Sequence, residues 1–393
     1  MTTAEVLDAV EEQRREILSV ARDFAQREIA PGAAHRDEHK EFAGDILQRL
    51  GELGFMGMTV TEEYDGLGLD TYTYLLVIEE LAAADASVAI SVSVHSSLPC
   101  LMLLEHGSEA QKQQWLKPMA RGELLAAFAL SEAESGSDAA AMRTQATRDG
   151  EAWVLNGTKA WVTNGDTADL LLLMARTDPP ESHRGARGIS AFIVPTNLPG
   201  VQALKAEDKM GLRSSSTTQV ELRDVRVGPE LMLGDEGKGF VYALQGLDQG
   251  RMGVAAQALG IARSALDLAL AYSADRKQFG QRIADFQGVQ FKLADMAVRV
   301  HAARALLRDA AEAKRRGETI TSKASMAKLF ASEAAMWVTT QAIQIFGGYG
   351  YMRDYPVERL FRDAKVTEIY EGTSEIQRVV IARELLRKYA SQR

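Results

Sequence analysis

The sequence predicts a mainly helical α+β protein in which helical domains precede and follow a central β region. The first third and the last part of the chain show apolar residues at helical spacing, whereas the middle consists of short β-prone runs separated by Gly and Pro. We expect an N-terminal helical domain over residues 1–122, a middle antiparallel β-barrel domain over 123–236 and a C-terminal four-helix bundle over 237–393. A chain of 393 residues is long enough for two or three such domains.

The first third is expected to be helical with short loops. Pro31 should end the first helix, and Pro99 falls in the tolerant first turn of a later one. Ser108 is placed as the N-cap of a further helix. The periodicity predicts helices over Val10–Ala30, Asp45–Leu53, Tyr72–Ala84 and Ser96–Leu104.

The middle region is expected to form an antiparallel sheet or small barrel. Two β-prone runs within Glu151–Val162 are joined by Asn156-Gly157, which is a strong hairpin signal. Further strands are expected at Leu170–Ala175, Ile189–Pro195, Gly200–Lys205 and Thr218–Val227.

Helical spacing returns after Gly239 and continues to the end of the chain. Segments of this length are typical of antiparallel helix bundles. The expected helices are Val241–Ala274, Ala284–Arg315, Ser322–Ile345 and Thr373–Lys388.

Composition excludes several classes of protein. Hydrophobic residues are 46% and charged residues 25%, as in soluble globular proteins, and the net charge of -9 argues against a nucleic-acid-binding surface. The single cysteine, Cys100, excludes an intrachain disulfide framework and lies among apolar residues as a small buried hydrophobe. Met1–Arg15 lacks the apolar run of a secretory signal, and Leu170–Ala175 is too short to span a membrane, so we expect a cytoplasmic protein.

One stretch, Ile369–Arg378, places a carboxylate between an aromatic ring and a glycine just before a helix. Tyr370 would desolvate Glu371 and favour a proton-accepting carboxylate, and Gly372 would let the backbone pass close to a ligand. Thr373 or Ser374 would cap the helix that follows. The functional interpretation is a general base, Glu371, held over a flat ligand; the alternative is a surface glutamate in an ordinary turn.

Two stretches could contact a planar cofactor. Phe128–Asp138 runs from a strand end through small hydroxyl residues to an expected helix start at Asp138, and it offers N–H and hydroxyl groups to a heterocycle or an anion. In Trp161–Gly165, an indole beside a hydroxyl and an amide could stack on such a ring. The structural alternatives are a capped connection and a core tryptophan.

Two further stretches carry charge. Asp248 and Arg251 lie on one helical face, as an ion pair or a ligand contact, and the mid-helix Gly250 suggests that another group approaches closely. Arg276–Gly280 places a basic pair near a helix end, suited to a phosphate or carboxylate, or to a C-cap. His35 and His39 are expected in a solvated loop, and no metal site is predicted.

Together these motifs, with Gln344–Gly350, resemble the acyl-CoA dehydrogenase family over nearly the whole chain. The resemblance implies one FAD per subunit and oxidation of an acyl-CoA thioester to the trans-2-enoyl-CoA. It identifies Glu371 as the base that removes the α-proton while hydride leaves the β-carbon for flavin N5, with the Glu371 amide as donor to the thioester oxygen. Glycine at 250 matters because some branches of the family carry the base there.

The resemblance also implies the binding residues. Thr163 would be the partner of N5, Ser131 would bond to the flavin ring, and Arg276 with Phe279 would reach a neighbouring subunit's FAD. Substrate contacts are expected from Ser137, Asp248, Arg251, Tyr370 and Gly372. Cofactor contacts are expected from Phe128, Leu130, Ser131, Gly136, Ser137, Trp161, Val162, Thr163, Arg276, Gln278, Phe279, Phe286, Gln287, Gln344, Ile345, Phe346, Gly347, Gly348, Thr373, Ser374 and Glu375.

The implied assembly is a homotetramer built as a dimer of dimers, with an electron-transfer flavoprotein as electron acceptor. Short (butyryl-type) or short branched acyl chains are expected. The run Ala133-Glu134-Ser135 departs from the proline that many members carry, and it adds a negative charge near the flavin loop. Alternatives are an acyl-CoA oxidase that uses O2, a decarboxylating glutaryl-type enzyme, and a non-catalytic scaffold of the same fold.

Overall fold

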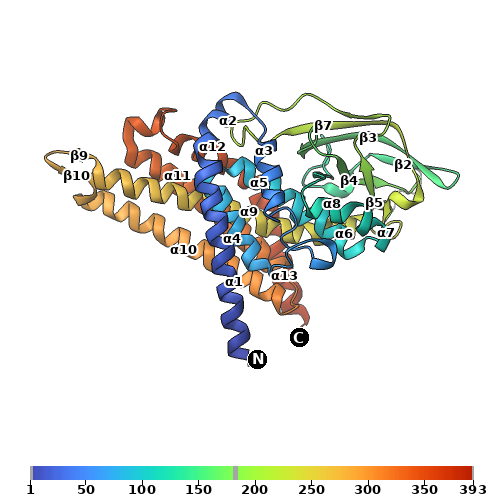
Figure 1. Ribbon diagram of the computed structural model, residues 1–393, viewed down its shortest axis with the longest axis horizontal. Helices are drawn as coiled ribbons and strands as arrows, with labels where there is room; N and C mark the ends of the chain where they lie inside the picture. Colours follow the sequence, from blue (N-terminus) through green and yellow to red (C-terminus); the bar gives the residue numbers. More distant parts are fainter. Residues whose placement is uncertain (1–2, 180–184, 392–393) are drawn as a thin grey trace.

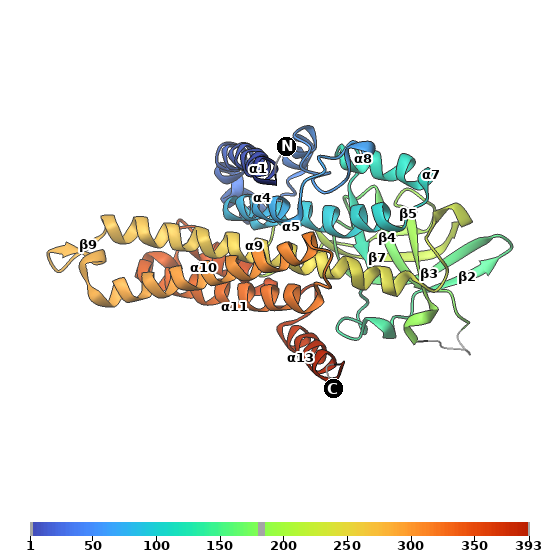
Figure 2. The same ribbon diagram turned by 90° about the horizontal axis from the view of Figure 1, so that it is seen from below.

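The computed structural model describes residues 3–179 and 185–391 and has the helical–β–helical order that the sequence predicts (Figure 1). The boundaries of the three expected domains stay a prediction. Parts of these domains lie outside the described residues, namely 1–2, 180–184 and 392–393. The long C-terminal helices lie at one end of the molecule and the sheet lies at the other, with the N-terminal helices along one side (Figures 1 and 2).

The N-terminal layer is helical, and three of its expected helices are observed at nearly the predicted positions. Ser108 forms a capping box with Gln111, as its placement at an N-cap predicts. The helices are α1 (Thr3–Phe24), α2 (Ala33–His39), α3 (Gly44–Glu52), α4 (Thr71–Ala84), α5 (Ala86–His95), α6 (Leu101–His106), α7 (Glu109–Gln111) and α8 (Lys117–Ala120).

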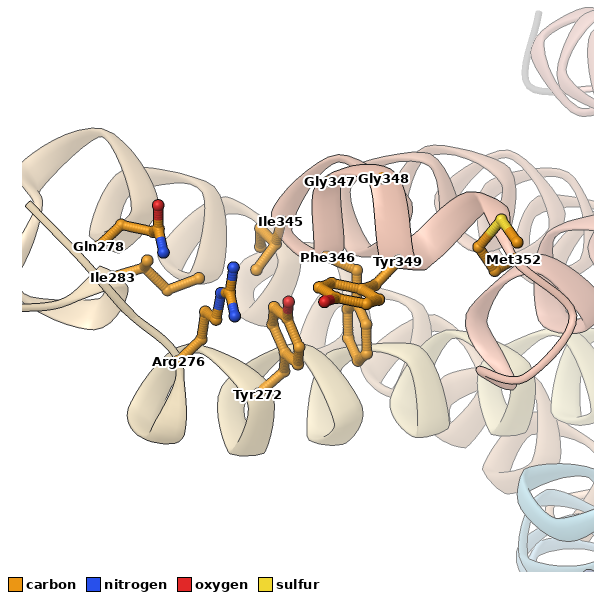
Figure 3. A pocket seen from close by; sticks show the side chains of 10 residues that line it. All are labelled: Tyr272, Arg276, Gln278, Ile283, Ile345, Phe346, Gly347, Gly348, Tyr349 and Met352. Atoms are coloured by element: carbon orange, nitrogen blue, oxygen red, sulfur yellow. The ribbon is translucent and has the colours of Figure 1, made fainter.

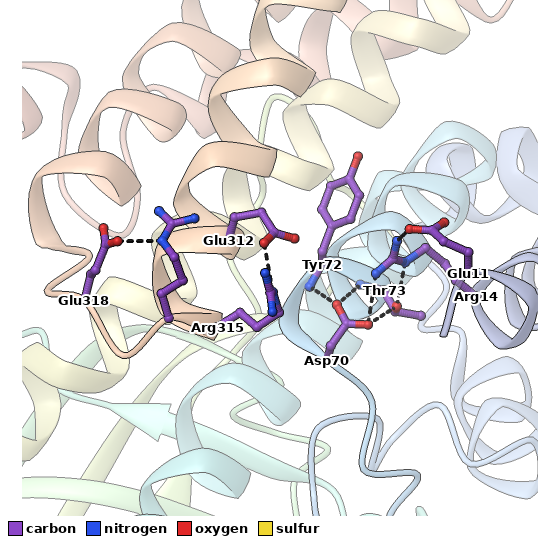
Figure 4. Close-up of polar contacts among 9 residues, drawn as sticks. Glu11, Arg14, Asp70, Tyr72, Thr73, Glu312, Arg315 and Glu318 are labelled. Carbon is purple, nitrogen blue, oxygen red and sulfur yellow. Dashed lines mark hydrogen bonds and ion pairs between the residues drawn. The ribbon is translucent and has the colours of Figure 1, made fainter. Parts of the chain in front are cut away.

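Helix α1 is attached to the start of α4 by a polar cluster (Figure 4). Asp70 caps α4 by accepting hydrogen bonds from the N–H groups of Tyr72 and Thr73, at 2.9 and 3.1 Å. Arg14 of α1 donates to Asp70 at 3.2 Å and to the Thr73 hydroxyl at 3.0 Å. The cap therefore also fixes how α1 packs on α4.

Two predictions for this layer are wrong. The helical run that starts with α1 ends at Ile29, just before Pro31, but a 3₁₀ turn, Ala30–Gly32, leads directly into α2, so His35 and His39 are on a helix and not in the expected loop. Pro99 is not in a first turn either, because it lies in a π-helical turn, Ser96–Cys100, between α5 and α6. The wider turn accommodates a residue that cannot donate a backbone hydrogen bond.

The β region is a mixed sheet whose strand order, in the described residues, is β6-β7-β3-β2-β4-β5-β8, with β1 beside β4. Most pairs are antiparallel as predicted, but β4 runs parallel to β1 and to one residue of β2. The strands are β1 (Ala126–Ala129), β2 (Gln145–Asp149), β3 (Ala152–Thr163), β4 (Leu170–Arg176), β5 (Ile189–Pro195), β6 (Val201–Ala203), β7 (Thr217–Val227) and β8 (Met232–Leu233).

Strand β4 is buried on both faces. Alternate side chains enter different cores: Leu170 and Leu172 pack with the helices, whereas Leu171 and Leu173 pack with the far side of the sheet. Period-two alternation across a pleated strand explains why a continuous apolar run is needed here.

The predicted Asn156-Gly157 hairpin is wrong. Strand β3 continues through both residues with a bulge, and the turn that joins β2 to β3 is at Gly150, which has a φ of 62°. Asn156 instead bonds to Asp224 of the neighbouring β7, accepting from its N–H at 2.9 Å. The Asp149-Gly150 pair was the correct turn signal.

The C-terminal bundle surrounds α9 (Gly239–Asp275), which packs on α4, α10 (Gln287–Arg315) and α11 (Thr321–Phe346). Between α9 and α10 lies a small hairpin of β9 (Lys277–Gln278) and β10 (Gln281–Arg282) at the free end of the bundle (Figure 1). Helix α13 (Ser374–Ser391) extends from the body, and the sequence analysis missed α12 (Val357–Thr367) (Figure 2).

Two helical stretches in the described residues have the length and the hydropathy of a membrane span. They are Ala86–His106, 94% buried, and Gly239–Asp275, 67% buried. Since both pack inside the protein, their hydrophobicity is accounted for by the core.

Candidate active site

The turn that carries Glu371 lies between α12 and α13. Glu371 adopts a φ of 51° and Gly372 one of 94°, so two consecutive residues have left-handed backbone conformations. A non-glycine residue rarely does so, and such conformations cluster at functional sites. The Thr373 hydroxyl accepts from the N–H of Ile376 at 3.3 Å, which confirms the predicted cap of α13.

The carboxylate of Glu371 is withdrawn from solvent and lies against α9. Both carboxylate oxygens are buried and have no hydrogen-bond partner among the described residues. A Cβ on Gly250 would lie 2.0 Å from Oε2, so only glycine leaves room for the carboxylate at this point of the helix. The close approach that the mid-helix Gly250 predicts is confirmed, and the approaching group is Glu371.

Burial raises the pKa of Glu371 to about 7, and the nearby charges of Lys328 and Arg251 act in the opposite direction. Desolvation disfavours the ionised form of a carboxyl group, and cations within reach favour it. A carboxyl group with a pKa near 7 can both hold and release a proton at neutral pH.

Tyr370 and the ion pair on α9 complete this site. Tyr370 donates its hydroxyl hydrogen to Gln257 of α9, and Gln257 donates in turn to the Ala86 carbonyl at 2.8 Å. Arg251 is paired with Asp248 at 2.6 Å, as their spacing predicts, and Asp248 also accepts from the Thr321 hydroxyl. The structure therefore brings Tyr370, Glu371 and Arg251 together.

A second set of predicted residues lies at the end of β3. Trp161 has a φ of 55° and its side chain is 57% exposed, beside a register shift in the β3–β7 pairing. A large aromatic ring held in strained backbone and presented to solvent fits a planar ligand rather than a core position. Next to it, Asn164 Oδ1 and Thr218 Oγ1 are buried without a partner among the described residues.

The loop Phe128–Asp138 is fastened to the same strand by a buried ion pair. Lys159 of β3 is fully buried, and its Nζ donates to Glu132 and to the Leu130 carbonyl, both at 2.9 Å. The Ala160 N–H also donates to the Ser131 carbonyl at 2.9 Å. These contacts hold Ser131 near Trp161, and neither Glu132 nor Lys159 was singled out from the sequence.

Some details of this loop differ from the expectation. Asp138 begins only a short 3₁₀ turn, Ala139–Ala141, and not a helix. The side chain of Val162 is buried in the sheet core. Glu134 is exposed and paired with Arg143 at 2.9 Å, which explains how its extra charge is accommodated.

The third set of predicted binding residues lies at the far end of the bundle, around a cavity of about 470 Å³ (Figure 3). Arg276 stacks over the Tyr349 ring at 5.4 Å, and Phe279, at the tip of the β9–β10 hairpin, is 93% exposed. The cavity is lined by Tyr272, Arg276, Gln278, Ile283, Ile345, Phe346, Gly347, Gly348, Tyr349 and Met352.

The structure does not bring all predicted cofactor residues together within one chain. Arg276 follows the end of α9, and the helix between Gly250 and Arg276 spans about 39 Å at 1.5 Å per residue. The β9–β10 hairpin with Arg276 and Phe279 lies at one end of the molecule, and the sheet that carries Trp161 lies at the other (Figure 1). Thr373, Ser374 and Glu375, by contrast, follow Glu371 after the single residue Gly372.

Sequence reasoning missed one charged residue of the Glu371 site, Lys328 of α11. Its side chain is fully buried, and its Nζ donates to the Gly372 carbonyl at 2.7 Å. The available signal was a lysine on the alanine-rich face of Ala324, Ala327 and Ala331, which is buried in the bundle. Among the described residues, no cluster of three or more His, Cys, Asp or Glu side chains could hold a metal ion.

Three family models match successive parts of the chain: the acyl-CoA dehydrogenase N-terminal domain over residues 11–123, the middle domain over 127–225 and the C-terminal domain over 237–386. The chain is 47% identical over 380 residues to the mitochondrial short-chain specific acyl-CoA dehydrogenase of Mus musculus, covering 97% of this chain and 92% of the relative.

Two solved structures are similar over almost their whole length. Butyryl-CoA dehydrogenase from Megasphaera elsdenii has a TM-score of 0.93 and 45% identity, covering 95% of this chain and 98% of that one. A chain in a structure described as the electron transferring flavoprotein of Acidaminococcus fermentans has a TM-score of 0.94 and 45% identity, covering 96% and 98%.

Proposed function

Since the chain belongs to the acyl-CoA dehydrogenase family and is an FAD-dependent enzyme of that class, we propose that it oxidises short acyl-CoA thioesters to trans-2-enoyl-CoA with Glu371 as the base. The observation that carries this proposal is the Glu371 carboxylate itself. It is buried, unpartnered among the described residues and accommodated by a glycine of α9. A glutamate in an ordinary surface turn would have none of these three properties.

The residues at the end of β3 fit a flavin. The exposed Trp161 ring would cover one face, and the Thr163 and Ser131 hydroxyls would bond to the polar edge of the ring. The orphaned polar atoms of Asn164 and Thr218 support a ligand with hydrogen-bonding groups at this place. When bound, FAD supplies the acceptor for the hydride that leaves the substrate β-carbon.

Glu371 removes the α-proton. The proton passes to the unpartnered carboxylate, the electron pair of the α-carbon forms the new double bond, and the hydride departs from the β-carbon. The α-proton is weakly acidic, so negative charge develops on the thioester oxygen and needs a donor. The Glu371 N–H is suited to this role because it donates to no acceptor among the described residues.

The rate of flavin reduction should depend on pH through Glu371. The base acts only when ionised, and burial raises its pKa to about 7. We therefore expect the anaerobic reduction rate to rise about tenfold per pH unit below pH 7 and to level off above it. A rate that is constant between pH 5.5 and 8.5 would contradict this assignment.

Short acyl chains are proposed as the substrates because the similar proteins are named for short-chain and butyryl substrates. The test is kcat/KM for a series of straight acyl-CoA esters from four to sixteen carbons, together with isobutyryl- and 2-methylbutyryl-CoA. We expect a maximum at four to six carbons or at a short branched chain. A maximum at twelve or more carbons would contradict the chain-length proposal but leave the reaction intact.

We also propose that the protein acts as a homotetramer, a dimer of dimers, that passes its electrons to an electron-transfer flavoprotein. The exposed Phe279 and the cavity beside Arg276 lie at the end of the bundle, whereas the sheet that carries Trp161 lies at the other end of the molecule (Figure 1). They are suited to the FAD of a neighbouring copy, together with Gln278, Phe286, Gln287 and Gln344. Light scattering of the flavin-bound protein should give the mass of four chains.

A further inference from the structure

A buried lysine lies beside the Glu371 turn, and the reaction described above gives it no role. Lys328 of α11 is fully buried, and its Nζ forms one hydrogen bond, to the Gly372 carbonyl at 2.7 Å. No carboxylate lies within 4.0 Å of this Nζ in the part of the chain that the structure describes. Burial of an ammonium group without a carboxylate partner is costly, which indicates a purpose beyond packing.

Both carbonyls of the strained turn are held by buried donors. The Gly372 carbonyl accepts from Lys328 of α11 and also from Nε2 of Gln377 of α13, at 2.9 Å. The same Gln377 Nε2 donates to the Glu371 carbonyl at 3.2 Å. The left-handed conformation of Glu371 is therefore stabilised from two different helices, by one charged and one neutral donor.

We infer that Lys328 is a positioning residue for Glu371: its bond to Gly372 holds the turn, and its charge stabilises the ionised carboxylate without pairing with it. This inference rests on the proposed role of Glu371 as the base. A direct ion pair would occupy the carboxylate oxygens, whereas here both remain free of partners among the described residues. Both carboxylate oxygens of Glu371 thus remain available to accept the proton, while the Lys328 charge still favours the ionised form.

The electrostatics of the site agree with this geometry. Burial raises the pKa of Glu371, and Lys328 is the stronger of the two cations that lower it, the other being Arg251 of α9. Tyr74 of α4 and Tyr370 also face the carboxylate, and burial raises the pKa of both, so they stay neutral.

Lys328 titrates in the same environment. Burial lowers its pKa to about 8, Glu371 opposes this shift most strongly, Arg251 adds to it, and Glu368 and Glu375 oppose it weakly. Removal of the lysine charge should therefore raise the pKa of Glu371 above its value in the unaltered enzyme.

The test is the pH dependence of anaerobic flavin reduction by butyryl-CoA, measured by stopped flow in Lys328→Met and Lys328→Gln. We expect the midpoint to move upward by about one pH unit or more, so that the rate at pH 7 falls about fivefold or more and recovers at higher pH. Lys328→Arg, which keeps both charge and donor, should restore the original midpoint. Gln377→Met is the matched control, because it removes a neutral donor from the same carbonyl and should leave the midpoint in place.

A Lys328→Met enzyme with the original midpoint would overturn the inference. If Lys328→Met fails to fold with flavin, Lys328→Gln decides by the same criterion, since it keeps a donor and loses only the charge. An equal shift in Gln377→Met would also overturn it, because the effect would then come from turn geometry alone. Glu371→Gln separates the two proposals. Flavin reduction that persists in this variant contradicts the role of Glu371 as the base. An inactive Glu371→Gln, combined with Lys328 variants whose pH midpoint does not move, contradicts only this inference.

Discussion

Glu371→Gln is expected to lower the rate of flavin reduction by a short acyl-CoA by about a thousandfold or more. The amide keeps the shape of the side chain but cannot take up the α-proton, and general-base catalysis is worth about 10² to 10⁴ in rate. Flavin content and acyl-CoA binding should be retained because the main chain of the turn is unchanged. The measurement is single-turnover reduction under anaerobic conditions, and a rate within tenfold of the unaltered enzyme would contradict the assignment.

The same variant should change stability in a pH-dependent way. The pKa of Glu371 is raised in the folded protein to about 7 from an ordinary value of 4.5. The buried carboxyl group therefore costs no stability below about pH 4.5, destabilises the fold increasingly between pH 4.5 and 7, and costs a constant amount on the order of 3 kcal/mol above pH 7. Glu371→Gln should melt at a higher temperature than the unaltered protein at pH 8, and the difference should vanish near pH 4.5.

Gly250→Ala is expected to have the second-largest effect, a loss of about a hundredfold in the rate of flavin reduction. A Cβ at this position would lie 2.0 Å from Glu371 Oε2, so the carboxylate must move. Displacement of a catalytic group by about 1 Å costs about 10² in rate. Because alanine favours helix more than glycine does, α9 itself should not be weakened.

Gly246→Ala is a matched control in the same helix. Its Cβ would meet flexible side-chain atoms of Leu98 and Met102 at 3.2 to 3.3 Å, which can adjust. We expect this control to keep the rate within a few-fold of the unaltered enzyme. An unchanged rate in Gly250→Ala would show that the carboxylate does not need the space that this glycine leaves.

The sequence predicted the long helices well because their apolar residues repeat with helical spacing and their packing partners are other helices. The expected Val241–Ala274 and Ser322–Ile345 differ from α9 and α11 by one or two residues at each end. The turn predicted at Asn156-Gly157 is absent because tertiary pairing of β3 with β7 overrides a local turn preference.

The candidate site was only partly predictable for a different reason. Glu371 and Gly250 lie far apart in sequence, yet each showed a local irregularity: a carboxylate before a glycine, and a glycine inside a helix. The only sequence signal for Lys328 was its position on an alanine-rich helix. Its role depends on how α11 packs against the turn. Trp161 and Arg276 lie at opposite ends of the molecule, and the proposed second copy of the chain that would unite them at one FAD is not encoded in any local pattern.

The most direct measurement is anaerobic titration of the purified, flavin-bound protein with butyryl-CoA. Glu371 should remove the α-proton as the hydride leaves, so one equivalent of butyryl-CoA should bleach the visible absorption of the oxidised flavin and yield trans-2-butenoyl-CoA. A short branched acyl-CoA that bleaches the flavin in its place would correct only the substrate. A flavin that no acyl-CoA of any length or branching can bleach would contradict the account.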